Sequence, residues 1–508
     1  MTMRLAKVAV FGLGALFAQL AAKAQEGLPP PRSDGERKRL AYATRENRPV
    51  DNHATEEVNA YPIDLATAIQ LADANSPLIR IAQSRMGAAQ ARKDLAELLF
   101  VPTLKFGPGY FRHDGVDQNR RGDVFQVSRS NSFALGGPSL NIDTAEAIYL
   151  PLVRLQQLNA SRENARAVRN RTQLSAANSY FDLLSIHGRL AINSEILDRV
   201  GQMLERAKVA DKAGLSKTKG DVDRALTELY LRRQERIRLE GQAGAAAARL
   251  AQVLLLPPET FLVPSEMGIY PLVLIPSDRS IEDLIETAVA NRPELASSRF
   301  MAGAANESLR LAQKEPLIPR LNLDYVGGVF GGGRNSFIGD TSSREDLLLQ
   351  MNWELRNFGF GNAAQIRERR AQLDISLSEV VQTQAVVTAE VTEAARLAAA
   401  LFDTLEAAQK AVIQVEELYR KLLASSFGMF GPRETYDALE PLLAIQEINR
   451  ARNNYLNEVI EFNKSQFELY MAIGEPPLEA LDGAQRVELG IPAVPTGEKL
   501  PRPDSKNP

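Results

Sequence analysis

Residues 347–361, LLLQMNWELRNFGFG, decide the fold because they join a strand pattern to the start of a helix. Apolar side chains occupy every second position in this stretch: Leu347, Leu349, Met351, Trp353 and Leu355. Alternation with a period of two predicts a strand that has one apolar and one polar face. From Asn362 to Ser426 the sequence is rich in Ala, Leu, Glu, Arg and Gln, which predicts one long helix.

Four such strands are expected. The spans are about 104–113, 132–142, 320–330 and 346–356. The connecting segments, Asp114 to Asn131 and Gly331 to Glu345, are polar and rich in Gly, Arg and Ser, so we expect them to be loops in solvent.

The chain contains an internal duplication. Three landmarks recur in the same order roughly 215 residues later: Asn75-Ser76-Pro77 as Asn291-Arg292-Pro293, Pro102-Thr103-Leu104 as Pro319-Arg320-Leu321, and Pro257-Pro258 as Pro476-Pro477. Each copy is predicted to contain a helix, two strands, a long helix, a turn and a returning helix. The first repeat spans 63–258 and the second 281–477, and 259–280 link them in an equatorial segment.

The predicted helices are long enough to define the architecture. They span Leu65 to Leu99, Asp143 to Ala213 and Asp221 to Leu256 in the first repeat, and Ile281 to Gln313, Asn362 to Ser426 and Arg433 to Ile473 in the second. A helix of 65 to 70 residues is about 100 Å long, roughly the length of the two shorter helices of a copy placed end to end. Antiparallel helices of these lengths predict a long helical barrel or bundle.

The two ends of the chain are expected to differ from the repeats. Residues 1–24 resemble a secretory signal peptide, with Arg4 and Lys7 before an apolar stretch and Ala22-Lys23-Ala24 as a cleavage site. Residues 25–62 are predicted to be a flexible N-terminal arm, and 478–508, which are rich in proline, a disordered C-terminal tail.

Composition gives no indication of a reaction centre. The 508 residues carry a net charge of -3, which does not indicate nucleic-acid binding. The absence of Cys excludes thiol catalysis and disulfides. The three histidines, His53, His113 and His187, lie too far apart for the spacing of a metal site. We therefore expect no catalytic residues, no metal and no cofactor, and a protein that is not an enzyme.

The alternating strands suit either of two settings. A sheet with one face in lipid shows this pattern, and so does a soluble sheet with one face on a core. Four strands cannot close a transmembrane barrel, whereas three copies would supply twelve. A periplasmic coiled-coil scaffold or adaptor without a barrel is the alternative.

Several local runs together resemble the TolC-type outer membrane efflux protein family. They are Tyr455 to Gly474, Trp353 to Gly361, and Asp221 to Ala225 after Gly214-Leu215. The resemblance implies a mainly α homotrimer with a 12-stranded β-barrel in outer-membrane lipid and an α-helical periplasmic tunnel. It also implies partnership with a periplasmic adaptor (a membrane fusion protein) and an inner-membrane transporter, for efflux or type I secretion of small molecules or proteins.

The same resemblance implies roles for residues at the periplasmic helix tips. The gate would be formed by Asp221, Arg433, Asp437 and Glu440. Contacts at the tip and docking of the adaptor would involve Gly214, Leu215, Phe427, Phe430 and Gly431. Independently, Tyr325 and Trp353 are candidates for a lipid-facing aromatic girdle. Tip charges are equally typical of solvated helix ends and caps.

Overall fold

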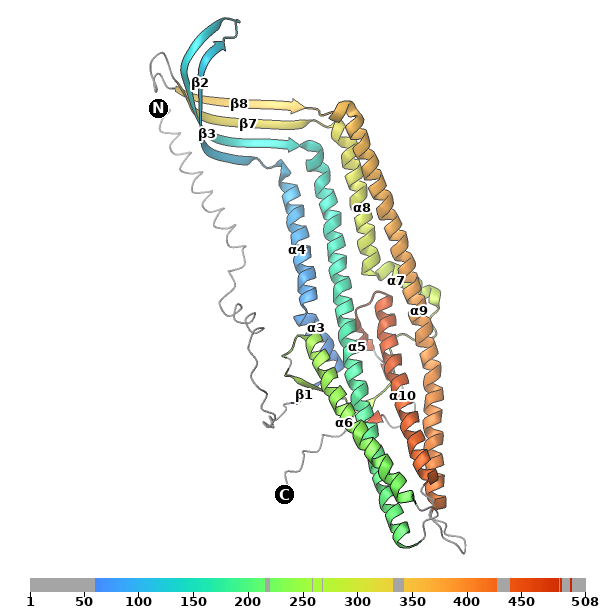
Figure 1. Cartoon of the computed structure of the whole chain (residues 1–508). Coiled ribbons are helices and arrows are strands. Elements are labelled where there is room, and N and C mark those ends of the chain that lie inside the picture. Colours follow the sequence, from blue (N-terminus) through green and yellow to red (C-terminus); the bar gives the residue numbers. More distant parts are fainter. Residues whose placement is uncertain are drawn as a thin grey trace, which may run out of the picture. The chain divides into compact units, whose positions relative to one another are not determined.

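The computed structural model describes residues 60–214, 220–257, 259–266, 268–331, 342–426, 439–483, 485–486 and 494–495. This part of the chain is mainly helical and contains one four-stranded antiparallel sheet (Figure 1). The expected signal peptide lies outside the described residues.

The first short helix of each half is interrupted at a proline. Helix α3 (Leu65–Asn75) starts at Asp64, whose carboxylate accepts a hydrogen bond from the Thr67 amide at 2.7 Å. Helix α4 (Pro77–Glu97) follows after Ser76 alone. A proline disfavours the helical conformation of the residue before it, so the expected single helix from Leu65 to Leu99 is two. Helices α7 (Ile281–Asn291) and α8 (Pro293–Lys314) repeat the break at Pro293.

The long helices have the predicted extents. Helix α5 (Thr144–Lys212) has 69 residues and is capped by Asp143, which accepts a hydrogen bond from the Glu146 amide at 3.1 Å. Helix α9 (Phe360–Ser426) has 67 residues. The returning helices α6 (Asp221–Leu254) and α10 (Leu439–Ala472) pack against α5 and α9, respectively.

The four strands pair in the order β2-β3-β7-β8. Their bounds are β2 (Thr103–Gln118), β3 (Val124–Asp143), β7 (Arg320–Gly331) and β8 (Ser342–Asn352). Short 3-10 turns connect helices and strands at Leu98–Phe100, Glu315–Leu317 and Arg356–Gly359. In Figure 1, β2 and β7 continue from the ends of α4 and α8, and β3 and β8 lead into the starts of α5 and α9.

The first expected loop is wrong over most of its length. Between Asp114 and Asn131 the strands continue to Gln118 and resume at Val124. The remaining turn is closed by the Asn119 amide, which donates to the Asp123 carbonyl at 3.0 Å. The polar composition of this segment indicates side chains in contact with water. It does not exclude strands, because strands pair through backbone hydrogen bonds, which need no apolar side chains. Within the second expected loop, from Gly331 to Glu345, Gly331 belongs to β7 and Ser342 to Glu345 belong to β8, whereas residues 332–341 lie outside the described residues.

Short strands correct the two expected disordered arms. Strand β1 (Ala60–Ile63) pairs in parallel with β4 (Phe261–Pro264), so the arm predicted over 25–62 ends earlier. In the tail predicted over 478–508, β9 (Gln485–Arg486) pairs with β6 (Leu272–Val273), and β10 (Val494–Pro495) with β5 (Gly268–Ile269). The proline-rich composition of this segment predicted disorder. Proline is nevertheless tolerated in a strand at the edge of a sheet, where its missing amide proton is not needed.

The tail also contains helix α11 (Pro477–Gly483), in which Pro477 takes the first helical position, where the missing amide proton costs nothing. Ala480 is 2% exposed, and the Leu478 amide donates to Gln173 of α5 at 3.3 Å. Residues after the second repeat therefore pack against the first.

The core lies where α5 and α10 cross the equatorial segment. Phe181 of α5 packs against Phe467 of α10 with ring centroids 5.6 Å apart, and both side chains are buried. Gly188 allows the close approach, because a Cβ atom there would lie 2.9 Å from Ile269 and from Leu456.

Candidate functional site

Near the helices, β3, β7 and β8 form one apolar face and one mainly polar face, as the alternation predicted. Directly paired residues of an antiparallel sheet share a face. Leu323 pairs with Leu140 and Leu349, whereas its neighbour Asn322 pairs with Asn141 and Gln350. On β8 the side chains of Leu347 and Leu349 are 69% and 72% exposed. A single chain therefore leaves its apolar face uncovered.

The two girdle candidates have different positions. Tyr325 lies in β7, pairs with Leu347 on the apolar face and is half-buried. Trp353 is 58% exposed but lies after Asn352, the last paired residue of β8. The predicted strand to residue 356 is therefore too long. The Arg356 amide donates a hydrogen bond to the side-chain oxygen of Asn362 at 2.8 Å, and this bond stabilises the turn before α9.

A charge cluster joins the sheet to the helices. Arg320, the first residue of β7, bonds to Asp143 at 2.8 Å, to Glu315 at 3.0 Å and to Glu354. Arg356 bonds to Glu315 at 2.7 Å. These residues come from three different strand–helix junctions, so the cluster fixes where the strands leave the helices. No local pattern predicted the cluster, because Asp143, Arg320 and Glu354 are distant along the chain.

The structure describes only part of the predicted gate. Asp221, the first residue of α6, is fully buried and lies 3.7 Å from Arg224. A carboxylate suits this position because the helix N-terminus carries partial positive charge. Glu440, the second residue of α10, is exposed, and Gly214 follows α5 with a φ of +68°. The other tip residues lie outside the described ranges: Leu215, Phe427, Phe430, Gly431, Arg433 and Asp437.

An ion-pair network that sequence reasoning missed connects three helices. Arg199 of α5 bonds to Glu195 at 2.7 Å and to Glu416 of α9 at 3.0 Å. Arg452 of α10 bonds to Glu416 at 2.5 Å and also to Glu195. On a long helix such charges are indistinguishable, by sequence, from solvated ones. Only the packing of α5, α9 and α10 brings them together.

The network perturbs the acid on α5. Burial by itself raises the pKa of Glu195, but the charges and hydrogen bonds of Arg452 and Arg199 outweigh burial and lower that pKa below its usual value of 4.5. Glu195 therefore stays ionised at neutral pH. The network is an electrostatic connection between helices and has no feature of a reacting group.

Across the ranges that the structure describes, no group of three or more His, Cys, Asp or Glu is placed to hold a metal ion. None of the described helices is both long enough and apolar enough to span a membrane.

Comparison with known proteins identifies relatives of the chain. The model of the family "Outer membrane efflux protein" matches residues 284–428. The pyoverdine export outer membrane protein OpmQ of Pseudomonas putida is 25% identical over 288 residues, which are 54% of this chain and 57% of that protein. The chain thus matches little more than half the length of this curated relative.

Solved structures share the fold over most of the chain. A membrane protein from Pseudomonas aeruginosa matches with a TM-score of 0.66 and 20% identity, covering 85% of this chain and 99% of that one. CusC matches with a TM-score of 0.65 and 19% identity over the same shares. VceC from Vibrio cholerae, an outer membrane protein, matches with a TM-score of 0.64 and 16% identity, covering 81% and 96%. At these identities the likeness establishes the fold.

Proposed function

From the match of residues 284–428 to the outer membrane efflux protein family, we propose that three copies of the chain form an exit duct for an inner-membrane pump. The family match and the similarity to an outer membrane export protein support a location in the outer membrane. In the proposed duct, cargo passes through a β-barrel that is continued by a helical tunnel in the periplasm.

The open, two-faced sheet carries the proposal. Its end strands are β2 and β8, and each has a single partner strand among the described residues. In lipid an unpaired backbone group costs several kcal/mol, so a four-stranded sheet cannot stand alone there. Pairing β8 of one copy with β2 of the next would close a ring of twelve strands. The face with Leu347 and Leu349 would then meet lipid, and the face with Asn322 and Gln350 would line the lumen.

The long helices support the periplasmic part of the duct. Helices α5 and α9, with 69 and 67 residues, are each about 100 Å long. The shorter helices pack along them: α4 and α6 on α5, and α8 and α10 on α9. We assign the ends near Gly214 and Glu440 to the docking of a periplasmic adaptor, which would connect the duct to its pump.

Charged residues at these ends would form the gate. Three copies of Asp437 and Glu440 in a narrow ring would repel one another and attract cations, and Arg433 would offset them. Asp221 is the fourth member, and its burial beside Arg224 supports a structural contribution at the first turn.

The cargo is proposed to be a small molecule. The relative named for pyoverdine export favours small-molecule efflux over protein secretion. No reaction is assigned to the chain, because the residues that support the proposal form walls, junctions and a gate.

Single-channel conductance in a planar bilayer tests the proposal, with the oligomeric mass measured on the same detergent-purified preparation. A trimer that gives small, stable, ohmic steps is the expected result. A species that fractionates with the soluble periplasmic extract and conducts nothing would overturn the duct and favour a coiled-coil scaffold.

A further inference from the structure

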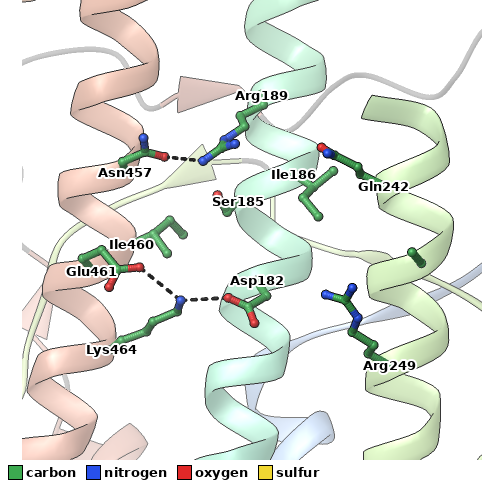
Figure 2. Close-up of a pocket in the computed structure, with 11 residues that line it drawn as sticks. Asp182, Ser185, Ile186, Arg189, Gln242, Arg249, Asn457, Ile460, Glu461 and Lys464 are labelled. Carbon is green, nitrogen blue, oxygen red and sulfur yellow. Dashed lines mark hydrogen bonds and ion pairs between the residues drawn. The ribbon is translucent and has the colours of Figure 1, made fainter. Parts of the chain in front are cut away.

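A polar pocket lies between α5, α6 and α10, away from both the sheet and the helix tips. Its volume is about 600 Å³, which is within the usual range for small-molecule sites. Figure 2 shows Arg189 of α5, Arg249 of α6 and Lys464 of α10 in its wall, so each of the three helices contributes one cation.

Only one of these cations is neutralised by carboxylates in the pocket. Lys464 bonds to Asp182 at 2.8 Å and to Glu461 at 3.1 Å. Arg249, whose side chain points from α6 toward α5 in Figure 2, forms no hydrogen bond or ion pair with the residues that the structure describes. The pocket therefore carries more positive than negative charge.

Arg189 is only partly satisfied. It donates one hydrogen bond, at 2.8 Å, to the neutral side chain of Asn457, while its Nε atom is buried without an acceptor among the described residues. Glu235 is close enough to Arg189 to interact with its charge, but this carboxylate forms its ion pair with Arg238, at 2.5 Å. A buried donor without an acceptor is costly, and a guanidinium presents a planar set of donors that matches an oxyanion.

The residues that line the pocket come from α5, α6 and α10, and none of them belongs to the equatorial segment. Tyr180 and Leu184 of α5 face the opposite way and line a separate cavity with Glu266 and Ile269. On α10, Asn463 faces the equatorial segment and accepts a hydrogen bond from the Leu272 amide. If the equatorial strands lie on the outside of the proposed duct, the pocket faces the tunnel.

We propose that this pocket binds the oxyanion group, a carboxylate or a phosphate, of a small molecule that moves along the helices. Arg189 and Arg249 hold the oxyanion, and the pair of Lys464 with Asp182 closes one side of the pocket. Placing the site in a tunnel rests on the proposed function, whereas the binding chemistry does not.

Isothermal titration of the detergent-purified full chain tests the site, with inorganic phosphate and citrate as separate probes at low ionic strength, because salt screens exposed charges. We expect saturable binding of at least one probe. Binding of phosphate alone, or of citrate alone, identifies which oxyanion the site takes. The combined variant Arg189→Gln with Arg249→Gln should weaken that binding at least about tenfold, since charge-assisted hydrogen bonds are lost.

A matched control removes the same charge elsewhere. Arg236→Gln with Arg310→Gln replaces two exposed arginines that pair with Glu240 and Glu307 on their own helices, and it should bind like the wild type. Asp182→Asn removes a negative charge from the pocket and should tighten binding, a gain that misfolding cannot mimic. Absence of saturable binding in the wild type, or an equal loss in the control, would overturn the proposal.

The site and the duct can fail separately. Binding of phosphate or citrate without conductance in the bilayer would support the oxyanion site and overturn the duct. Conductance without binding of either probe would leave the duct and overturn the site.

Discussion

Asn463 connects the segment between the two halves to α10 through one buried amide. Its oxygen accepts from the Leu272 amide at 2.8 Å and its nitrogen donates to the Tyr270 carbonyl at 2.9 Å. Gln466, one turn later, accepts from the amides of Leu274 and Ile275. Both lie in the run that carried the family resemblance, and their role is to satisfy a buried backbone.

Replacing Asn463 tests this role. Asn463→Ala leaves the Leu272 amide buried without its acceptor and should lower the free energy of unfolding by about 1–3 kcal/mol, measured by urea unfolding in detergent. Asn453→Ala is the control, because Asn453 donates within its own helix, to the Asn449 backbone at 2.7 Å and to its side chain. A loss equal to that of the control would refute the role.

Glu195 makes the stability of the helices depend on pH. Its folded pKa lies below the usual 4.5, so its contribution is complete above pH 4.5 and is lost as pH falls through the folded pKa. Glu195→Gln should therefore lower the melting temperature at pH 7, and the difference from the wild type should shrink below pH 4.5. A difference that is independent of pH would show that the charge of Glu195 is irrelevant.

At the scale of elements, β8 determines which face of the sheet is apolar. Neighbouring residues of a strand point to opposite faces, so Leu349 and Gln350 form a matched pair for substitution. Arginine on a lipid-facing barrel position costs roughly 2–4 kcal/mol at the bilayer midplane. The two substitutions therefore separate the lipid face from the lumen face with the same introduced charge.

Leu349→Arg should reduce the amount of folded protein recovered from outer membranes, whereas Gln350→Arg should leave it near the wild-type level. Quantitative blotting of purified outer-membrane fractions measures both variants. Equal recovery of the two variants would argue against lipid on the apolar face.

The junction around Arg320 is the second important element. One guanidinium bonds to Asp143 at the start of α5, to Glu315 after α8 and to Glu354 before α9. Arg320→Gln should loosen these junctions and increase proteolysis between strands and helices, measured by limited digestion with chymotrypsin, which cleaves after aromatic and large apolar residues and loses no site in this variant. Arg310→Gln, which removes the ion pair between an exposed arginine and Glu307 on the same helix, should leave the chymotrypsin digestion pattern unchanged.

At the scale of the whole molecule, the gate depends on several copies of the chain. Arg433→Ala with Asp437→Ala should raise single-channel conductance, because charges proposed to hold the constriction are removed. Glu447→Ala with Arg450→Ala, two exposed charges of α10, is the control and should conduct like the wild type. Unchanged conductance in the first variant would reject the gate assignment.

Local pattern predicted the elements of this chain well. The alternation in β8 and the extent of α5 follow from periods of two and 3.6 residues, which are set by neighbouring residues. The strand extensions beyond Asp114 and the packing of α11 did not follow, because backbone pairing and burial against a distant helix leave no local pattern.

The sequence by itself determined the helix and strand types, the duplicated order of elements and the two-faced strands, because each depends on residues close together in the chain. Only the tertiary structure decided which charges meet. Glu195 forms an ion pair with Arg452 because helices remote in sequence pack side by side. For the same reason, Arg189, Arg249 and Lys464 line one pocket. An ion pair or a pocket is a property of distances in space, and spacing along the chain does not contain those distances.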